Sequence, residues 1–157
     1  MDNSSLSGLQ NVKANSRQPG GSHYANSSSE GMQHWDFVYK HNLDYFQGNS
    51  SKYLCRWRRK GGILDLQKAL HYVEKAHELA LSGPPLPVRD MGQPSDMLGS
   101  ALVFGASSDM TAAEVLTLVD IMHGDWAQAA GRLELLTKEC QATSDVIVTG
   151  DQKVYRG

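Results

Sequence analysis

The 157-residue sequence is poor in cysteine and in long apolar runs. Its two cysteines, Cys55 and Cys140, form no CxxC pair and lack the density of a secreted disulfide scaffold. No apolar run approaches the roughly 20 residues that a membrane-spanning helix needs. The N-terminus also lacks the apolar core of a signal peptide. We therefore expect a cytoplasmic protein without a membrane partner.

Both common phosphate-binding loops are missing, since the sequence has neither GxxxxGK(S/T) nor GxGxxG. Metal-binding patterns are incomplete as well. Glu74 and His77 form one Glu-x-x-His pair, whereas a di-iron helical bundle needs two such pairs and further carboxylates. We therefore predict no protein metal site, and any phosphate must be bound by cationic side chains.

Positive charge is concentrated in one short stretch. Five cations fall within nine residues: Lys52, Arg56, Arg58, Arg59 and Lys60. On a helix, Lys52, Arg56 and Lys60 (or Arg59) lie along one edge, with Asn49 one turn earlier. Guanidinium and ammonium groups aligned in this way suit phosphate. The alternative is an ordinary solvated helix face.

The formal net charge of −2 conceals an asymmetry along the chain. Residues 32–80 carry 8 Lys and Arg against 5 Asp and Glu, whereas residues 81–140 carry 3 against 8. A basic segment followed by an acidic one favours a small anionic ligand over a nucleic acid, which calls for a broader positive field. It also favours a homo-oligomer in which basic and acidic parts meet.

Residue patterns divide the chain into five segments. Residues 1–31 are rich in Ser, Asn and Gly and predict a disordered arm. Residues 32–81 predict three helices, with Asp44 capping the second and Gly61-Gly62 ending it after the cationic cluster. Residues 82–110 predict a Pro- and Gly-rich linker, in which 97–105 are ambiguous between helix and strand.

The remaining two segments complete a mainly α fold. Residues 111–140 predict a helical pair that starts at a Thr111–Glu114 capping box and is broken at Gly124. Residues 141–157 predict a tail or a short β-hairpin around Gly150. The expected architecture is a small helical bundle with a disordered N-terminal arm.

The spaced pattern HY…N-x-x-K-Y-L-x-R-x-x-x-K-G-G-x-x-D-L-x-K-A, from His23 to Ala69, resembles the phage nucleotide kinases, a family long catalogued as a domain of unknown function. The resemblance covers about residues 22–80. It implies transfer of a phosphoryl group from a nucleoside triphosphate to a deoxynucleoside monophosphate such as dTMP or dGMP. It also implies a large homo-oligomer, no P-loop and, for a phage protein, the host cytoplasm.

Within this hypothesis, Lys52, Arg56 and Asp65 are the candidate catalytic residues. Asp65 either orients an arginine or helps to hold Mg²⁺ brought by the triphosphate, and it can equally be a first-turn helix cap. The candidates for binding substrate and phosphate are His23, Tyr24, Asn49, Arg59, Lys60 and Lys68. Arg56 is expected to be exposed, so that Arg56→Ala would remove nucleotide binding and leave the fold intact. The rival functions are nucleotide sequestration without turnover and, less well supported, a nucleic-acid adaptor.

Overall fold

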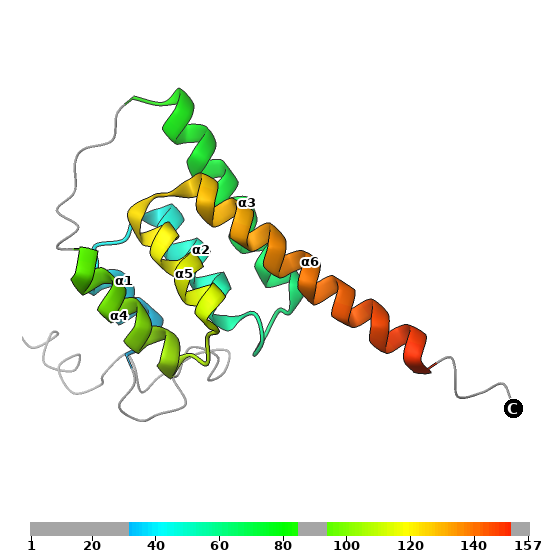
Figure 1. Cartoon of the computed structure of the whole chain (residues 1–157). Helices are drawn as coiled ribbons and strands as arrows, with labels where there is room; N and C mark the ends of the chain where they lie inside the picture. The colour runs from blue at the N-terminus through cyan, green and yellow to red at the C-terminus, as the bar shows by residue number, and fades with distance from the viewer. Residues whose placement is uncertain (1–31, 85–93, 152–157) are drawn as a thin grey trace, which may run out of the picture.

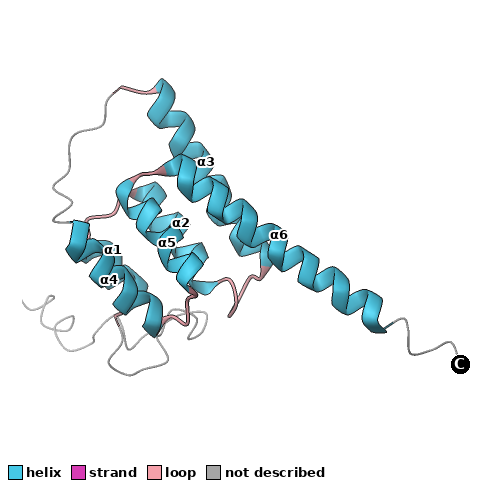
Figure 2. Cartoon of the chain, viewed as in Figure 1, coloured by secondary structure: helices cyan, strands magenta, loops and turns pink. Residues whose placement is uncertain are grey.

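The computed structural model describes residues 32–84 and 94–151, and these contain six helices and no strand (Figures 1 and 2). The helices are α1 (His34–Lys40), α2 (Tyr45–Arg56), α3 (Ile63–Ser82), α4 (Pro94–Ser107), α5 (Ala112–His123) and α6 (Trp126–Asp151). The predicted mainly α, small bundle is confirmed.

The bundle is organised around α3, which packs against α2 and α6 (Figure 1). Leu66, Ala69, Val73 and Ala76 recur every three or four residues and are buried, so they form the apolar stripe of this helix. Helix α5 packs against α2, α4 and α6. Helices α1 and α4 meet where the Phe37 and Phe104 rings stack with their centroids 4.4 Å apart.

Local capping residues fix the ends of α2 and α5. The Asp44 side chain accepts a hydrogen bond from the Gln47 backbone N–H, and the Gln47 side chain accepts one in return from the Asp44 backbone. Thr111 and Glu114 form the same reciprocal capping box at the start of α5. Gly124 ends α5 in the left-handed conformation, with φ of 74°. All three boundaries follow from the predicted signals.

The cationic cluster is not a continuous helix. Helix α2 ends at Arg56, so Arg58, Arg59 and Lys60 lie in the turn that leads to α3. Gly62 precedes α3 with φ of 53°, a conformation that favours glycine. The prediction that Lys60 shares a helix edge with Lys52 and Arg56 is wrong, because the turn begins before the expected stop at Gly61.

Two other predicted segments differ from the structure. The linker expected over 82–110 contains α4, and the ambiguous 97–105 stretch is helical. The prediction of a hairpin around Gly150 is wrong for the residues up to Asp151, because these residues belong to α6. A continued helix satisfies its backbone groups locally, whereas a two-stranded hairpin is only marginally stable alone.

The predicted arm over 1–31 and the last six residues lie outside the described residues. No described helix is both long and apolar enough to cross a membrane.

Candidate functional site

The cationic residues that lie closest together surround the ring of Tyr53, between α2 and α3. Lys52 Nζ lies 5.0 Å, Arg56 Cζ 4.6 Å and Lys68 Nζ 5.3 Å from the ring centroid. The Tyr72 ring stacks on the Tyr53 ring at 5.8 Å, with an interplanar angle of 19°. Lys52 and Arg56 are one turn apart on α2, and Lys68 and Tyr72 are one turn apart on α3. We call these five residues the Tyr53 face.

Asp65 anchors two of these cations from the first turn of α3. Arg56 donates from Nε to Oδ2 at 2.9 Å and from Nη2 to Oδ1 at 3.3 Å, while Lys68 Nζ lies 3.6 Å from Oδ1. The Asp65 carboxylate is 1% exposed, and Arg56 is 7% exposed. The predicted exposure of Arg56 is therefore wrong, because a buried carboxylate on the neighbouring helix draws its guanidinium inward. Of the alternatives for Asp65, the structure shows the one in which it orients an arginine.

Gly61 leaves room for this ion pair. A Cβ atom built on Gly61 would lie 2.2 Å from the Asp65 carboxyl carbon, closer than side-chain atoms approach one another. The glycine is thus needed for close approach of the turn to the Asp65 carboxylate. Gly62, in contrast, is needed for its positive φ.

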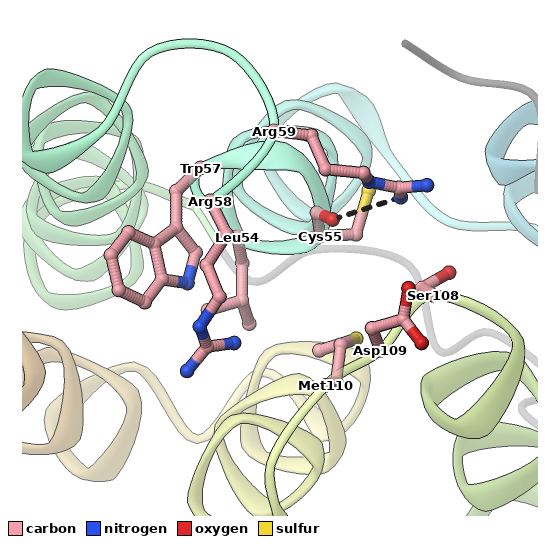
Figure 3. Close-up of a pocket in the computed structure, with 8 residues that line it drawn as sticks. All are labelled: Leu54, Cys55, Trp57, Arg58, Arg59, Ser108, Asp109 and Met110. Atoms are coloured by element: carbon pink, nitrogen blue, oxygen red, sulfur yellow. Dashed lines mark hydrogen bonds between the residues drawn. The ribbon is translucent and has the colours of Figure 1, made fainter.

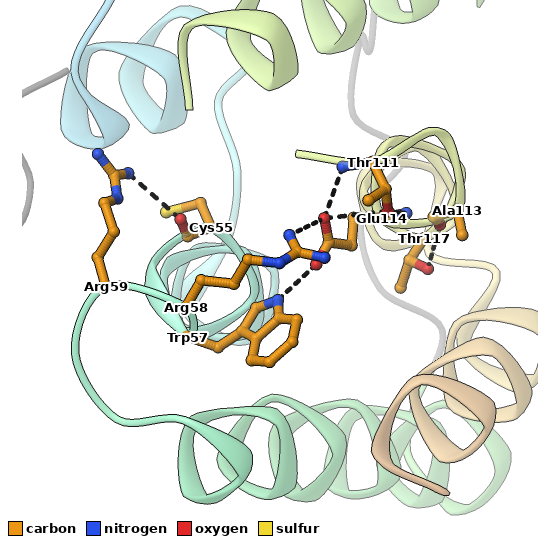
Figure 4. A network of polar contacts seen from close by, with 8 residues as sticks. All are labelled: Cys55, Trp57, Arg58, Arg59, Thr111, Ala113, Glu114 and Thr117. Carbon is orange, nitrogen blue, oxygen red and sulfur yellow. Dashed lines mark hydrogen bonds and ion pairs between the residues drawn. The ribbon is translucent and has the colours of Figure 1, made fainter. Parts of the chain in front are cut away.

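A second buried carboxylate, that of Glu114, binds another residue of the cationic cluster, Arg58 (Figure 4). Glu114 is fully buried and accepts hydrogen bonds from the Trp57 indole and from Arg58 Nη1, the latter at 2.6 Å. The same carboxylate caps the backbone of Thr111. Sequence reasoning identified Glu114 only as a helix cap, since no local signal indicates a partner 56 residues away. Arg58 thus joins α5 to the turn after α2.

Arg59 lies on another side of this turn, away from the α2–α3 interface (Figure 3). Its Nη2 donates to the Cys55 carbonyl at 3.3 Å. Arg59, Cys55 and Asp109 help to line a cavity of about 20 Å³, which has room for one water molecule but not for a nucleotide. Burial raises the pKa of the Cys55 thiol to about 12, so the neighbouring cations do not activate it.

Two polar side chains of α2 and α1 are committed to structural hydrogen bonds. Asn49 donates from its amide to the Tyr45 carbonyl at 2.8 Å, within its own helix. His34 Nε2 lies 2.9 Å from the Ser51 hydroxyl. Burial, helped by Lys52 and Arg56, lowers the pKa of His34 to about 4, so its imidazole is neutral near pH 7. Sequence reasoning did not single out His34, because its contacts with Ser51 and with the Phe104 ring join positions that are far apart in the chain.

The structure therefore gathers only part of the predicted site. Lys52, Arg56, Asp65 and Lys68 come together, whereas Arg59 lies elsewhere and the exposed Lys60 has no contact that ties it to Tyr53. His23 and Tyr24 lie outside the described residues. Within 32–84 and 94–151, no three His, Cys, Asp or Glu side chains are grouped to hold a metal ion.

Comparison with known proteins gives one partial match. Residues 17–74 match the model of a family described as a protein of unknown function, DUF3310. That match covers α1, α2 and the first part of α3. No curated protein and no solved structure matches the chain. The identification as a phage nucleotide kinase family member is therefore wrong, because the matched family has no described function and nothing indicates a kinase family.

Proposed function

We propose that this chain is a cytoplasmic nucleotide-binding enzyme that transfers a phosphoryl group from a nucleoside triphosphate to a deoxynucleoside monophosphate. The observation that carries the proposal is the convergence of three cations on the Tyr53 ring. Asp65 contacts Arg56 and Lys68, so one carboxylate is paired with a face that carries three cations, and an excess of positive charge remains. An anionic ligand would offset that charge.

The residues of the face have different roles in this proposal. Arg56 is held in place by Asp65 and supplies fixed positive charge near the ring. Lys52 approaches the ring from α2 and Lys68 approaches it from α3, and the Lys68 side chain is 54% exposed, so it can reach a phosphate in solvent. Phosphoryl transfer depends mainly on positioning and on neutralising the charge of the transferred group, which suits such a face. Mg²⁺ would enter with the triphosphate.

Nucleotide binding without turnover is the second candidate, and the state of Asp65 favours it. This carboxylate is buried and engaged by Arg56 and Lys68, so it is poorly placed to help hold the Mg²⁺ of a triphosphate. A sequestering protein would use the same cations and would need neither Mg²⁺ nor in-line geometry. The two functions differ only in product formation.

The test combines binding with product analysis. The chain is mixed with ATP, Mg²⁺ and each of the four deoxynucleoside monophosphates, and nucleotides are separated by anion-exchange chromatography. New diphosphate supports the kinase, whereas calorimetric binding without product supports sequestration. We expect Lys52→Ala and Lys68→Ala each to weaken nucleotide binding by about tenfold, the loss of one charged hydrogen bond. Lys138→Ala, exposed on α6, is the matched control. Unchanged affinity in both site variants would remove this face from the proposal.

We also propose that the chain forms a homo-oligomer. Large apolar side chains are exposed on several helices, among them Tyr39 at 89%, Leu81 at 76% and Val103 at 66%. Burying such side chains against a second copy is favourable because apolar area leaves water. Light scattering in moderate salt tests this, and a monomeric mass at high protein concentration would contradict it.

A further inference from the structure

An apolar groove lies beside the Tyr53 face, where the start of α2, the end of α3 and the start of α6 meet. Its volume is about 410 Å³, within the range of small-molecule sites. The side chains that matter for its chemistry are Tyr45, Phe46, Leu79, Ala80 and Trp126. One tyrosine ring, one phenylalanine ring and one indole thus border an open site that none of the predicted residues explains.

A row of aromatic rings connects this groove to the cations. Tyr45, which lines the groove, meets Tyr72 edge-on at 5.9 Å, and Tyr72 stacks on Tyr53 at 5.8 Å. The groove and the Tyr53 face are therefore the two ends of one continuous surface.

We propose that the groove binds the base of the nucleotide whose phosphates bind Lys52 and Lys68. This inference rests on the proposed nucleotide binding and adds where the base lies. A base is planar and has weakly polar faces, so it gains from stacking on aromatic side chains. Its phosphates are set apart from it by a sugar, much as the cations are set apart from the groove by Tyr72. A purely aliphatic ligand, in contrast, would bind in the groove without contacting Lys52 or Lys68.

The decisive measurement follows the indole N–H signals of the three tryptophans by NMR in the wild-type chain. Trp35→Phe and Trp126→Phe assign the signals. We expect one or more of dTMP, dGMP, dAMP and dCMP to shift the Trp126 signal strongly and the Trp35 signal little. Inorganic pyrophosphate, which has no base, should leave the Trp126 signal in place while binding through Lys52.

A filled groove provides the second measurement. Ala80→Leu narrows the groove without changing charge, and Ala142→Leu is the matched control because Ala142 is exposed farther along α6. We expect Ala80→Leu to weaken binding of the nucleotide at least tenfold and to change pyrophosphate binding less than twofold. Circular dichroism checks that both variants remain helical.

The outcomes separate this inference from the proposed function. An unmoved Trp126 signal with all four nucleotides, together with pyrophosphate binding that is lost in Lys52→Ala, would overturn the groove and leave the phosphate face standing. Absence of both nucleotide and pyrophosphate binding would overturn both proposals. A shift of Trp126 by decanoate that equals the shift by nucleotides would show an aliphatic site and overturn the inference.

Discussion

Replacing Arg56 by alanine should destabilise the fold, and not only weaken binding. The substitution leaves the fully buried Asp65 carboxylate without its bidentate partner. Removing one member of a buried ion pair typically costs about 3–5 kcal/mol, because the remaining charge stays desolvated. Lys68 still lies 3.6 Å from Asp65 Oδ1 and offsets part of this loss. We therefore expect the lower end, a loss of about 3 kcal/mol in the free energy of unfolding.

Urea unfolding followed by circular dichroism measures this loss. With an m-value of about 2 kcal/mol/M, the midpoint of Arg56→Ala should fall by about 1.5 M. Lys52→Ala is the matched control, since this cation sits on the same helix and ring but makes no ion pair in the described structure. Its midpoint should change by less than about 0.5 M.

A double variant tests the cause. Arg56→Met combined with Asp65→Asn removes both charges and keeps similar side-chain volumes, so it should be more stable than Arg56→Ala alone. An Arg56→Ala variant within about 1 kcal/mol of the wild type would refute the reasoning, because the ion pair would then contribute no more than an exposed one. A double variant less stable than Arg56→Ala would refute it as well.

Three further predictions follow from other features. The pKa of His34 is lowered from 6.5 to about 4, so the unfolded chain binds a proton at a higher pH than the folded chain does. The free energy of unfolding should therefore fall by about 3 kcal/mol as the pH drops from 6.5 to 4. In urea unfolding, His34→Gln should flatten this pH dependence. Gly61→Ala should lower the thermal midpoint, because its Cβ would lie 2.2 Å from the Asp65 carboxyl carbon. Gly131→Ala, whose Cβ would meet no atom within 4 Å, should raise the midpoint because alanine has the higher helix propensity. Equal shifts of the two midpoints would contradict the close-approach argument. Deleting residues 1–20 should leave nucleotide binding nearly intact because that stretch lacks an apolar anchor, whereas deletion through Tyr24 should weaken it; equal affinities would remove the arm from the site.

Much of the fold could be predicted because its signals are local. The apolar stripe of α3 and the caps at Asp44, Thr111 and Gly124 each depend on residues within one or two turns. The end of α2 could not be placed, because Trp57 and Arg58 leave the helix to meet Glu114 on α5. That contact joins positions more than 50 residues apart.

The site was predicted in part for the same reason. Helical spacing correctly placed Lys52 and Arg56 one turn apart, but it could not show which neighbouring charge each would meet. Asp65 pairs with the buried Arg56, and Glu114 pairs with Arg58, so the cationic run is divided between the Tyr53 face and the contact of the turn with α5. The aromatic row from Tyr45 to Tyr53 was missed entirely, since it depends on how α2 and α3 pack.

The packing of α3 bears on how this chain can be dissected. The family match ends at residue 74, inside α3, and the side of α3 that holds Val73 and Ala76 is buried in a bundle that includes α6. A fragment cut after α3 would expose that apolar stripe to water and would tend to aggregate. We therefore expect the matched segment of this chain to need α6, or another apolar surface in its place, in order to fold.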